Sequence, residues 1–219
     1  MSTYSLEKIV TCLRDVSDIT WGRYAFKSEM LKNKIQTEQT DEMILNAIVC
    51  GTGWAQQLRS ITDAVSIDSL LKQLGLCLNE NDLDMTAMPR QLFAQYIPDK
   101  QVEIMTQPIN IYSRIYKPPL PEPDLIRSIL IAHEMYHHIE RLNKSDIYSQ
   151  TEKICLWNLL GLKWYSTVRT IGEIAAMSFA KSLTNADFNP FMLDVILLYG
   201  YNEILAERIF HDIMYIEAG

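Results

Sequence analysis

The chain has 219 residues, of which 48% are hydrophobic and 21% are charged, so a disordered or low-complexity chain is excluded. Its formal net charge of −7 argues against the phosphate backbone of a nucleic acid as the main partner, because such binding relies on clustered lysines and arginines. The four cysteines form no CxxC pair, so neither a thiolate zinc site nor a compact disulfide framework is indicated.

The amino-terminal segment does not have the pattern of a secretory signal. Glu7, Lys8 and Arg14 interrupt the stretch in which an apolar core would have to form. No apolar run approaches the about 18 residues that a membrane-spanning helix needs. We therefore expect a soluble cytoplasmic protein that has no membrane partner and does not bind nucleic acid directly.

The first part of the chain has a helical pattern. Apolar residues recur at helical spacing over residues 6–34, and the polar segment after Thr37 predicts a connection to a second helix that begins near Asp41. Periodic apolar faces of this kind usually pack a core. We interpret residues 1–65 as an N-terminal helical region to which no chemistry is assigned.

The next segment mixes a helix with predicted strands. A helix is expected over residues 66–75, where Ser66 can cap the start and a glycine can end the helix. The apolar residues 76–78 follow directly and favour a short strand. Alternating apolar and polar residues then predict a β-hairpin over residues 93–105, with its turn at residues 98–100.

A proline-rich loop over residues 117–123 leads into the most informative helix of the chain. We predict that this helix begins with Asp124 as its N-cap and continues to Leu142. Further helices are predicted at residues 151–165, 170–183, 190–199 and 202–215. The expected fold is α+β and mainly helical, with a small hairpin or sheet beside the informative helix, and residues 66–219 form one domain with the carboxy-terminal helices.

The informative helix carries an HExxH motif at His133, Glu134 and His137. Residues four apart lie about 40° apart around a helix and about 6 Å apart along it, so both imidazoles can bind one metal ion. Glu134 lies beside the pair, where its carboxylate can act as general base on a metal-bound water. Two histidines, one carboxylate and an open position are typical of catalytic zinc sites, so we predict Zn²⁺ as the cofactor.

A catalytic zinc site needs a third protein ligand. Glu173 is the best candidate, because its carboxylate lies among small and apolar residues on a core-like helix face. Its neighbours Gly172, Ala175 and Ala176 would let this helix approach the HExxH helix closely. The alternative is an exposed glutamate at a helix start, with Thr170 as the cap.

Other glutamates compete with this assignment. Glu140 should lie roughly 10 Å beyond His133 along the same helix, which places it past the metal ion. Glu152 lies in a polar segment without an apolar setting. Glu203 and Glu207 on the last predicted helix remain candidates if that helix folds back onto the site.

The predicted hairpin, the HExxH helix and a later ExxAxxFA pattern that begins at Glu173 resemble the ImmA/IrrE family of zinc metallopeptidases. The likeness extends over about residues 66–183, because the short helix before the hairpin is also similar. The resemblance implies a zincin-like fold of the gluzincin type and a role in cleaving or controlling a transcriptional repressor. It also implies a site composed of Glu134 as general base and of the zinc ligands His133, His137 and Glu173.

The leading hypothesis is an intracellular zinc metallopeptidase that hydrolyses a peptide bond in a protein or peptide substrate, with a transcriptional regulator as the partner that the resemblance suggests. The alternative is a regulatory protein that binds such a partner and whose metal site is structural or whose peptidase activity has lapsed. The intact Glu134 favours the enzyme. The sequence leaves the oligomeric state open.

Several residues near the motif receive no role. His138 lies five residues after His133 and should point away from the ligand face, and the same objection applies to His211 on the last predicted helix. A tyrosine could stabilise an oxyanion, but the spacing does not distinguish between Tyr112, Tyr136, Tyr165 and Tyr201.

Overall fold

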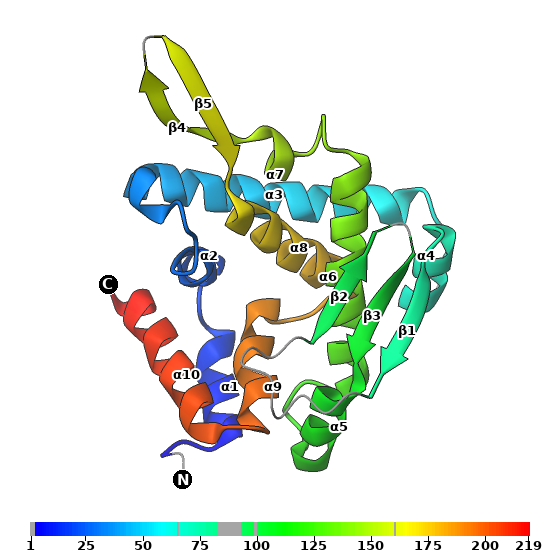
Figure 1. Ribbon diagram of the computed structural model, residues 1–219. Helices are drawn as coiled ribbons and strands as arrows, with labels where there is room; N and C mark the ends of the chain where they lie inside the picture. Colours follow the sequence, from blue (N-terminus) through cyan, green and yellow to red (C-terminus); the bar gives the residue numbers. More distant parts are fainter. Residues whose placement is uncertain (1–2, 65, 83–92, 99, 160) are drawn as a thin grey trace.

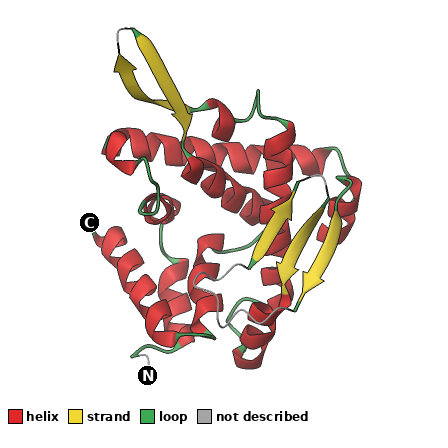
Figure 2. Cartoon of the chain, in the orientation of Figure 1, coloured by secondary structure: helices red, strands yellow, loops and turns green. Residues whose placement is uncertain are grey.

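The structure is a computed structural model that describes residues 3–64, 66–82, 93–98, 100–159 and 161–219 (Figure 1). The fold is α+β, 63% helical, with one sheet of three strands and one of two (Figure 2). The predicted mainly helical α+β class is therefore confirmed. Within the described ranges, no helix combines the length and the apolar character that crossing a bilayer would require.

The amino-terminal region is helical, as predicted. It contains α1 (Leu6–Arg14), α2 (Asp18–Phe26), the 3-10 turn η1 (Lys32–Lys34) and α3 (Thr37–Ser60). The expected start of the second helix near Asp41 was wrong, because the polar segment from Thr37 forms the first turn of α3. Glu38 in that turn suits the positive end of the helix dipole.

The helix α4 (Ile67–Gln73) follows, and Ser66 caps it as predicted by accepting a hydrogen bond from the Ser69 N–H. Gly75 has a φ of +74°, the left-handed conformation expected after a helix end. Strand β1 (Cys77–Asn81) begins two residues later. The predicted short strand is thus confirmed and is longer than expected.

The three-stranded sheet contains the predicted hairpin. Strands β2 (Ala94–Ile97) and β3 (Gln101–Met105) are antiparallel, and β1 pairs with β3 in parallel, so the order is β1-β3-β2. The predicted turn at residues 98–100 lies partly outside the described residues, which omit position 99. Val102 and Ile104 are buried, and the sheet packs on α6.

Helix α5 (Thr106–Ile115) was not predicted, and it connects the sheet to the proline-rich loop. The HExxH helix α6 (Pro123–Leu142) begins earlier than expected. Its N-cap is Glu122 and not Asp124, because Pro123 occupies the first helical position, where its missing N–H has no cost. Asp124 lies in the first turn.

The helix predicted over residues 151–165 was wrong. After the short α7 (Tyr148–Thr151), this segment forms an antiparallel hairpin of β4 (Lys153–Leu159) and β5 (Leu162–Thr167). Gly161 between the strands has a φ of +86°, which a helix interior does not allow. The leucines suggested a helix, but the turn glycine and the aromatic residues favour paired strands.

The carboxy-terminal helices agree with the remaining predictions. They are α8 (Arg169–Thr184), the 3-10 turn η2 (Pro190–Met192), α9 (Leu193–Tyr199) and α10 (Glu203–Ala218). Asn189 caps η2 and Asn202 caps α10, each by accepting a hydrogen bond from a backbone N–H.

Helix α8 packs against α3 on one side and α6 on the other (Figure 1). At Gly51 of α3, a Cβ atom would lie only 2.0 Å from the carbonyl oxygen of Ala175, so only glycine permits this approach. One apolar core, which extends from Leu6 to Ile213, includes residues on both sides of position 65. This packing determines where α8 presents Glu173.

Candidate metal centre

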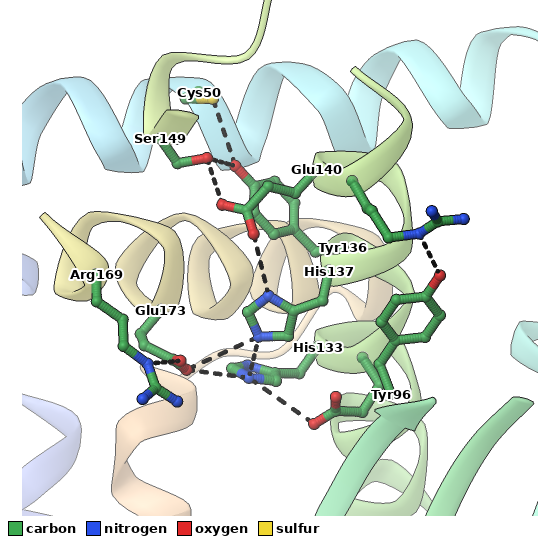
Figure 3. Close-up of polar contacts among 11 residues, drawn as sticks. Cys50, Tyr96, His133, Tyr136, His137, Glu140, Ser149, Arg169 and Glu173 are labelled. Carbon is green, nitrogen blue, oxygen red and sulfur yellow. Dashed lines mark hydrogen bonds and ion pairs between the residues drawn. The ribbon is translucent and has the colours of Figure 1, made fainter. Parts of the chain in front are cut away.

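The predicted ligands His133, His137 and Glu173 meet where α6 and α8 pack together (Figure 3). The Nε2 atoms of the two histidines are 3.1 Å apart. Glu173 Oε2 lies 3.4 Å from Nε2 of His133 and 3.8 Å from Nε2 of His137. His133 and His137 lie one helical turn apart, and Glu173 follows His137 by 36 positions. The three side chains nevertheless direct their donor atoms at one point.

These distances fit a bound metal ion. Three ligand atoms at about 2.0–2.1 Å from a tetrahedral ion lie roughly 3.3–3.4 Å from one another, and the observed separations of 3.1, 3.4 and 3.8 Å bracket that value. The donor set of two imidazole nitrogens and one carboxylate oxygen suits a transition-metal cation better than magnesium or calcium, which prefer oxygen ligands.

The approach of α8 to α6 depends on one of the small residues that flank Glu173. A Cβ atom at Gly172 would lie 2.8 Å from Glu140 Oε1 on α6, so a larger residue would displace that carboxylate. Ala175, which we expected to serve the same contact, instead places its carbonyl oxygen against Gly51 of α3. The small residues of α8 therefore serve two different interfaces.

The charges of the centre are interdependent. Burial alone would raise the pKa of Glu173, but the two histidines and Arg169 outweigh it and hold this pKa at about 2. Burial alone would lower the pKa of His133, yet Glu173 and Glu134 raise it. Each group thus favours the charged form of the other, and the carboxylates of Glu173 and Glu134 favour a positive charge beside His133, a place that a metal ion would take from the proton.

Glu134 lies beside the three ligand atoms and not among them. It is buried, and its Oε1 atom is 3.9 Å from Nε2 of His133. This is the position that the HExxH spacing predicts for a carboxylate that contacts a group held by the ligands. The geometry allows Glu134 to accept a proton from a water molecule at the centre.

His137 is supported from behind by Glu140. Glu140 Oε2 lies 3.5 Å from Nδ1 of His137, and Ser149 donates a hydrogen bond of 2.6 Å to Oε1 (Figure 3). Burial alone would raise the pKa of Glu140, but His137 and Ser149 outweigh it and lower this pKa. An acceptor on Nδ1 directs Nε2 of His137 toward the metal position.

Helical spacing argued against Glu140 as a ligand, but its supporting role was not predicted. The signal was present in the spacing, because Glu140 follows His137 by three residues and such pairs are neighbours on a helix. The support continues through Ser149 to the hydroxyl group of Tyr136, at 3.3 Å, and from there to Cys50 of α3, at 3.6 Å. Residues of the amino-terminal region thus reach the centre indirectly.

A cavity of about 960 Å³ opens beside the three ligands. Its walls come from β2, α6, α7, α9, the end of β5 and the amino-terminal half of α8. Arg169 is exposed at the rim, 4.0 Å from Glu173, and Asp194 of α9 contributes negative charge. The volume accommodates a stretch of several amino-acid residues.

The other candidates from the sequence lie elsewhere. His138 is buried with its Nδ1 atom 2.8 Å from the hydroxyl group of Tyr96, so it supports the contact between α6 and β2. Among the described residues, the group that could hold a metal ion does not include the competing carboxylates of Glu140, Glu152, Glu203 and Glu207. The cavity walls likewise do not include Tyr112, Tyr136, Tyr165 or Tyr201.

Comparisons with family models, with curated proteins and with solved structures found no match to this chain.

Proposed function

We propose that this chain is a zinc-dependent metallopeptidase with a zincin-like site that hydrolyses a peptide bond in a protein substrate. The family resemblance suggests a transcriptional regulator as that substrate. The observation that supports the proposed hydrolysis is the convergence of His133, His137 and Glu173 on one point with Glu134 beside them. Three protein ligands leave a coordination position for water, which is typical of catalytic zinc sites and supports the proposal.

The proposed chemistry assigns one task to each side chain. His133 and His137 hold the ion as neutral imidazoles through Nε2, and Glu173 contributes the negative charge. Zinc, when bound, lowers the pKa of water and polarises a carbonyl group. Glu134 accepts the proton of the attacking water and returns it to the leaving amine.

The three-stranded sheet offers a way to hold the substrate. Strand β2 pairs with β3 on one side only, as far as the described chain shows, and Ala94 to Tyr96 line the cavity. An extended peptide could add to this edge through backbone hydrogen bonds, independently of its sequence. The scissile bond would then pass the centre beside Glu134.

The test combines metal content with activity. We expect about one zinc ion per purified chain by elemental analysis. Glu134→Gln should keep this zinc and lower the hydrolysis of a fluorogenic peptide library at least ~100-fold, because the amide keeps the shape but cannot accept the proton. Glu152→Gln, which changes a half-buried carboxylate outside the centre, is the matched control and should not alter either value.

Two results would contradict the proposal. A chain that contains no zinc and takes up none would remove the metal centre. Zinc binding without hydrolysis would favour the alternative of a regulatory protein with a structural metal site. Hydrolysis that Glu134→Gln leaves unchanged would remove Glu134 from the mechanism. An active wild-type chain would also allow Glu134→Gln to be used as a trap to identify the substrate.

A further inference from the structure

The β4–β5 hairpin projects from the helical body above α3 (Figure 1). Its register pairs Trp157 with Trp164 and Leu159 with Leu162. Paired residues, and residues two apart on a strand, point to the same side, so these four side chains share one side of the ribbon. They are between 48% and 72% exposed. We call Trp157, Leu159, Leu162 and Trp164 the hairpin face.

The residues of the hairpin face are arranged in a definite order from the turn toward the helical body. The leucines lie next to the turn, and the tryptophans lie one pair further from it, with their rings parallel at a centroid distance of 6.3 Å. Aliphatic groups favour the hydrocarbon of a bilayer, whereas tryptophan favours the interface between hydrocarbon and headgroups. The sequence of side chains from the turn to the body therefore follows the layers of a membrane.

The charge of the hairpin is opposite to that of the chain. Residues 153–169 contain Lys153, Lys163 and Arg169 but no aspartate or glutamate, although the whole chain has a net charge of −7. Lys163 pairs with Asn158 on the side opposite the hairpin face and is exposed. Lys153 and Lys163 share the side opposite the hairpin face, where they are available to contact anionic headgroups at a membrane surface.

We propose that the hairpin face binds the surface of a membrane that contains anionic lipids. A second copy of the chain fits less well, because pairing two hairpin faces would leave the lysines on the opposite side without a role. An apolar protein groove would require neither the cationic side nor the order of leucines before tryptophans. The bilayer accounts for the exposure, the order and the charge together.

The proposal revises our expectation that the chain has no membrane partner. It concerns attachment to one surface of a bilayer and requires no membrane-spanning helix. Thr167, Val168 and Arg169 at the base of the hairpin line the cavity, so attachment would bring the cavity opening close to the membrane. The inference goes beyond the proposed hydrolysis and does not depend on it.

The test uses the purified chain and two kinds of vesicle, one of phosphatidylcholine alone and one of phosphatidylcholine mixed with phosphatidylglycerol. We expect the chain to sediment with the anionic vesicles and at least ~10-fold more weakly with the neutral ones. The tryptophan fluorescence should shift to shorter wavelength on binding, because Trp157 and Trp164 leave water.

The variant Leu159→Ser/Leu162→Ser keeps both tryptophans as reporters and should lower vesicle binding at least ~10-fold. Lys163→Gln should lower it about fivefold, and only on anionic vesicles. Leu45→Ser/Val49→Ser on α3 is the matched control, since these residues are exposed apolar side chains outside the hairpin. It should bind vesicles as the wild type does.

The proposal is overturned if the wild type binds neither kind of vesicle, or if the leucine variant binds as strongly as the wild type. A chain that forms dimers through the hairpin face, detected by sedimentation velocity, and ignores vesicles would assign the face to a second copy. The readout needs neither zinc nor a peptide, so its failure is distinct from failure of the proposed hydrolysis.

Discussion

Helix α8 and the β4–β5 hairpin are adjacent in the sequence but are held in place very differently. Helix α8 is packed between α3 and α6, and its residues Ile171 and Phe179 are fully buried. The hairpin stands clear of the body and exposes Trp157 and Trp164. Both segments are rich in apolar residues, so composition alone does not distinguish them. The comparison predicts that changes around α8 affect stability and metal binding, whereas changes in the hairpin affect neither strongly.

The largest loss of stability is expected at the contact between α3 and α8. Gly51→Ala should lower the free energy of unfolding by about 3 kcal/mol, because its Cβ would lie 2.0 Å from the carbonyl oxygen of Ala175 and the backbone must move. Gly53→Ala on the same helix is the matched control, since a Cβ there meets nothing within 4 Å. It should stabilise the chain by about 0.5–1 kcal/mol.

Chemical denaturation of the two glycine variants, monitored by circular dichroism, decides this prediction. Equal stability of the two variants would mean that α3 and α8 are further apart than the structure shows. It would also remove the argument that close packing on α3 determines the position of Glu173.

The next largest effect is expected at the residue that supports His137. Glu140→Gln should lower zinc affinity 10-fold to 100-fold, because the amide is a weaker acceptor for the His137 N–H. Competition with a chelator of known affinity measures the change. Ser149→Ala, which removes one donor to Glu140, should have a smaller effect in the same direction. Zinc affinity that Glu140→Gln leaves unaltered would show that packing alone orients His137.

The sequence predicted those parts of the molecule in which local pattern and tertiary structure agree. The HExxH spacing on α6, the capped helix α4 and the β2–β3 hairpin all depend on neighbours a few residues away. Glu173 could be chosen because its apolar setting indicated a carboxylate on the packed side of its helix, and the side chain is half-buried in the structure. The support of His137 by Glu140 was accessible in principle, because it also depends on helical spacing.

Other features could not be read from local pattern. Residues 153–167 have helix-forming leucines, whereas the turn glycine Gly161 and the aromatic residues favour strands, and the pairing of Trp157 with Trp164 in three dimensions decides between the two. Thr170 was considered as a possible cap, yet it lies inside α8, and a carboxylate from the distant Glu29 binds its N–H. Such contacts join residues 141 positions apart and leave no periodic signal.

This distant carboxylate leads to a pH-dependent prediction. Glu29 is buried and accepts hydrogen bonds from the N–H and hydroxyl groups of Thr170, at 3.0 and 2.9 Å, and from the Leu31 N–H at 3.0 Å. Burial alone would raise its pKa, but these donors lower it below the ordinary value of 4.5. The ionised form therefore stabilises the fold above pH 4.5, and this contribution is lost as the pH falls through the lowered pKa.

Glu29→Gln should accordingly lower the free energy of unfolding by about 1–2 kcal/mol at pH 7, because an amide group cannot accept all three hydrogen bonds. The difference from the wild type should shrink when denaturation is repeated at pH values below 4.5. Glu38→Gln, at the exposed start of α3, is the control and should change stability little at either pH. A difference that grows on acidification would contradict the assigned direction of the pKa shift.

The smallest effect is expected in the hairpin. Trp157→Ala/Trp164→Ala removes an exposed cross-strand pair, which contributes about 0.2–1 kcal/mol in such positions. The start of α8 should be unaffected, because Glu29 binds Thr170 directly after the hairpin ends. Zinc affinity should therefore equal that of the wild type within about twofold. A loss of zinc affinity of more than about tenfold would show that the hairpin positions Glu173. The contrast between a firmly packed α8 and an independent hairpin would then be wrong.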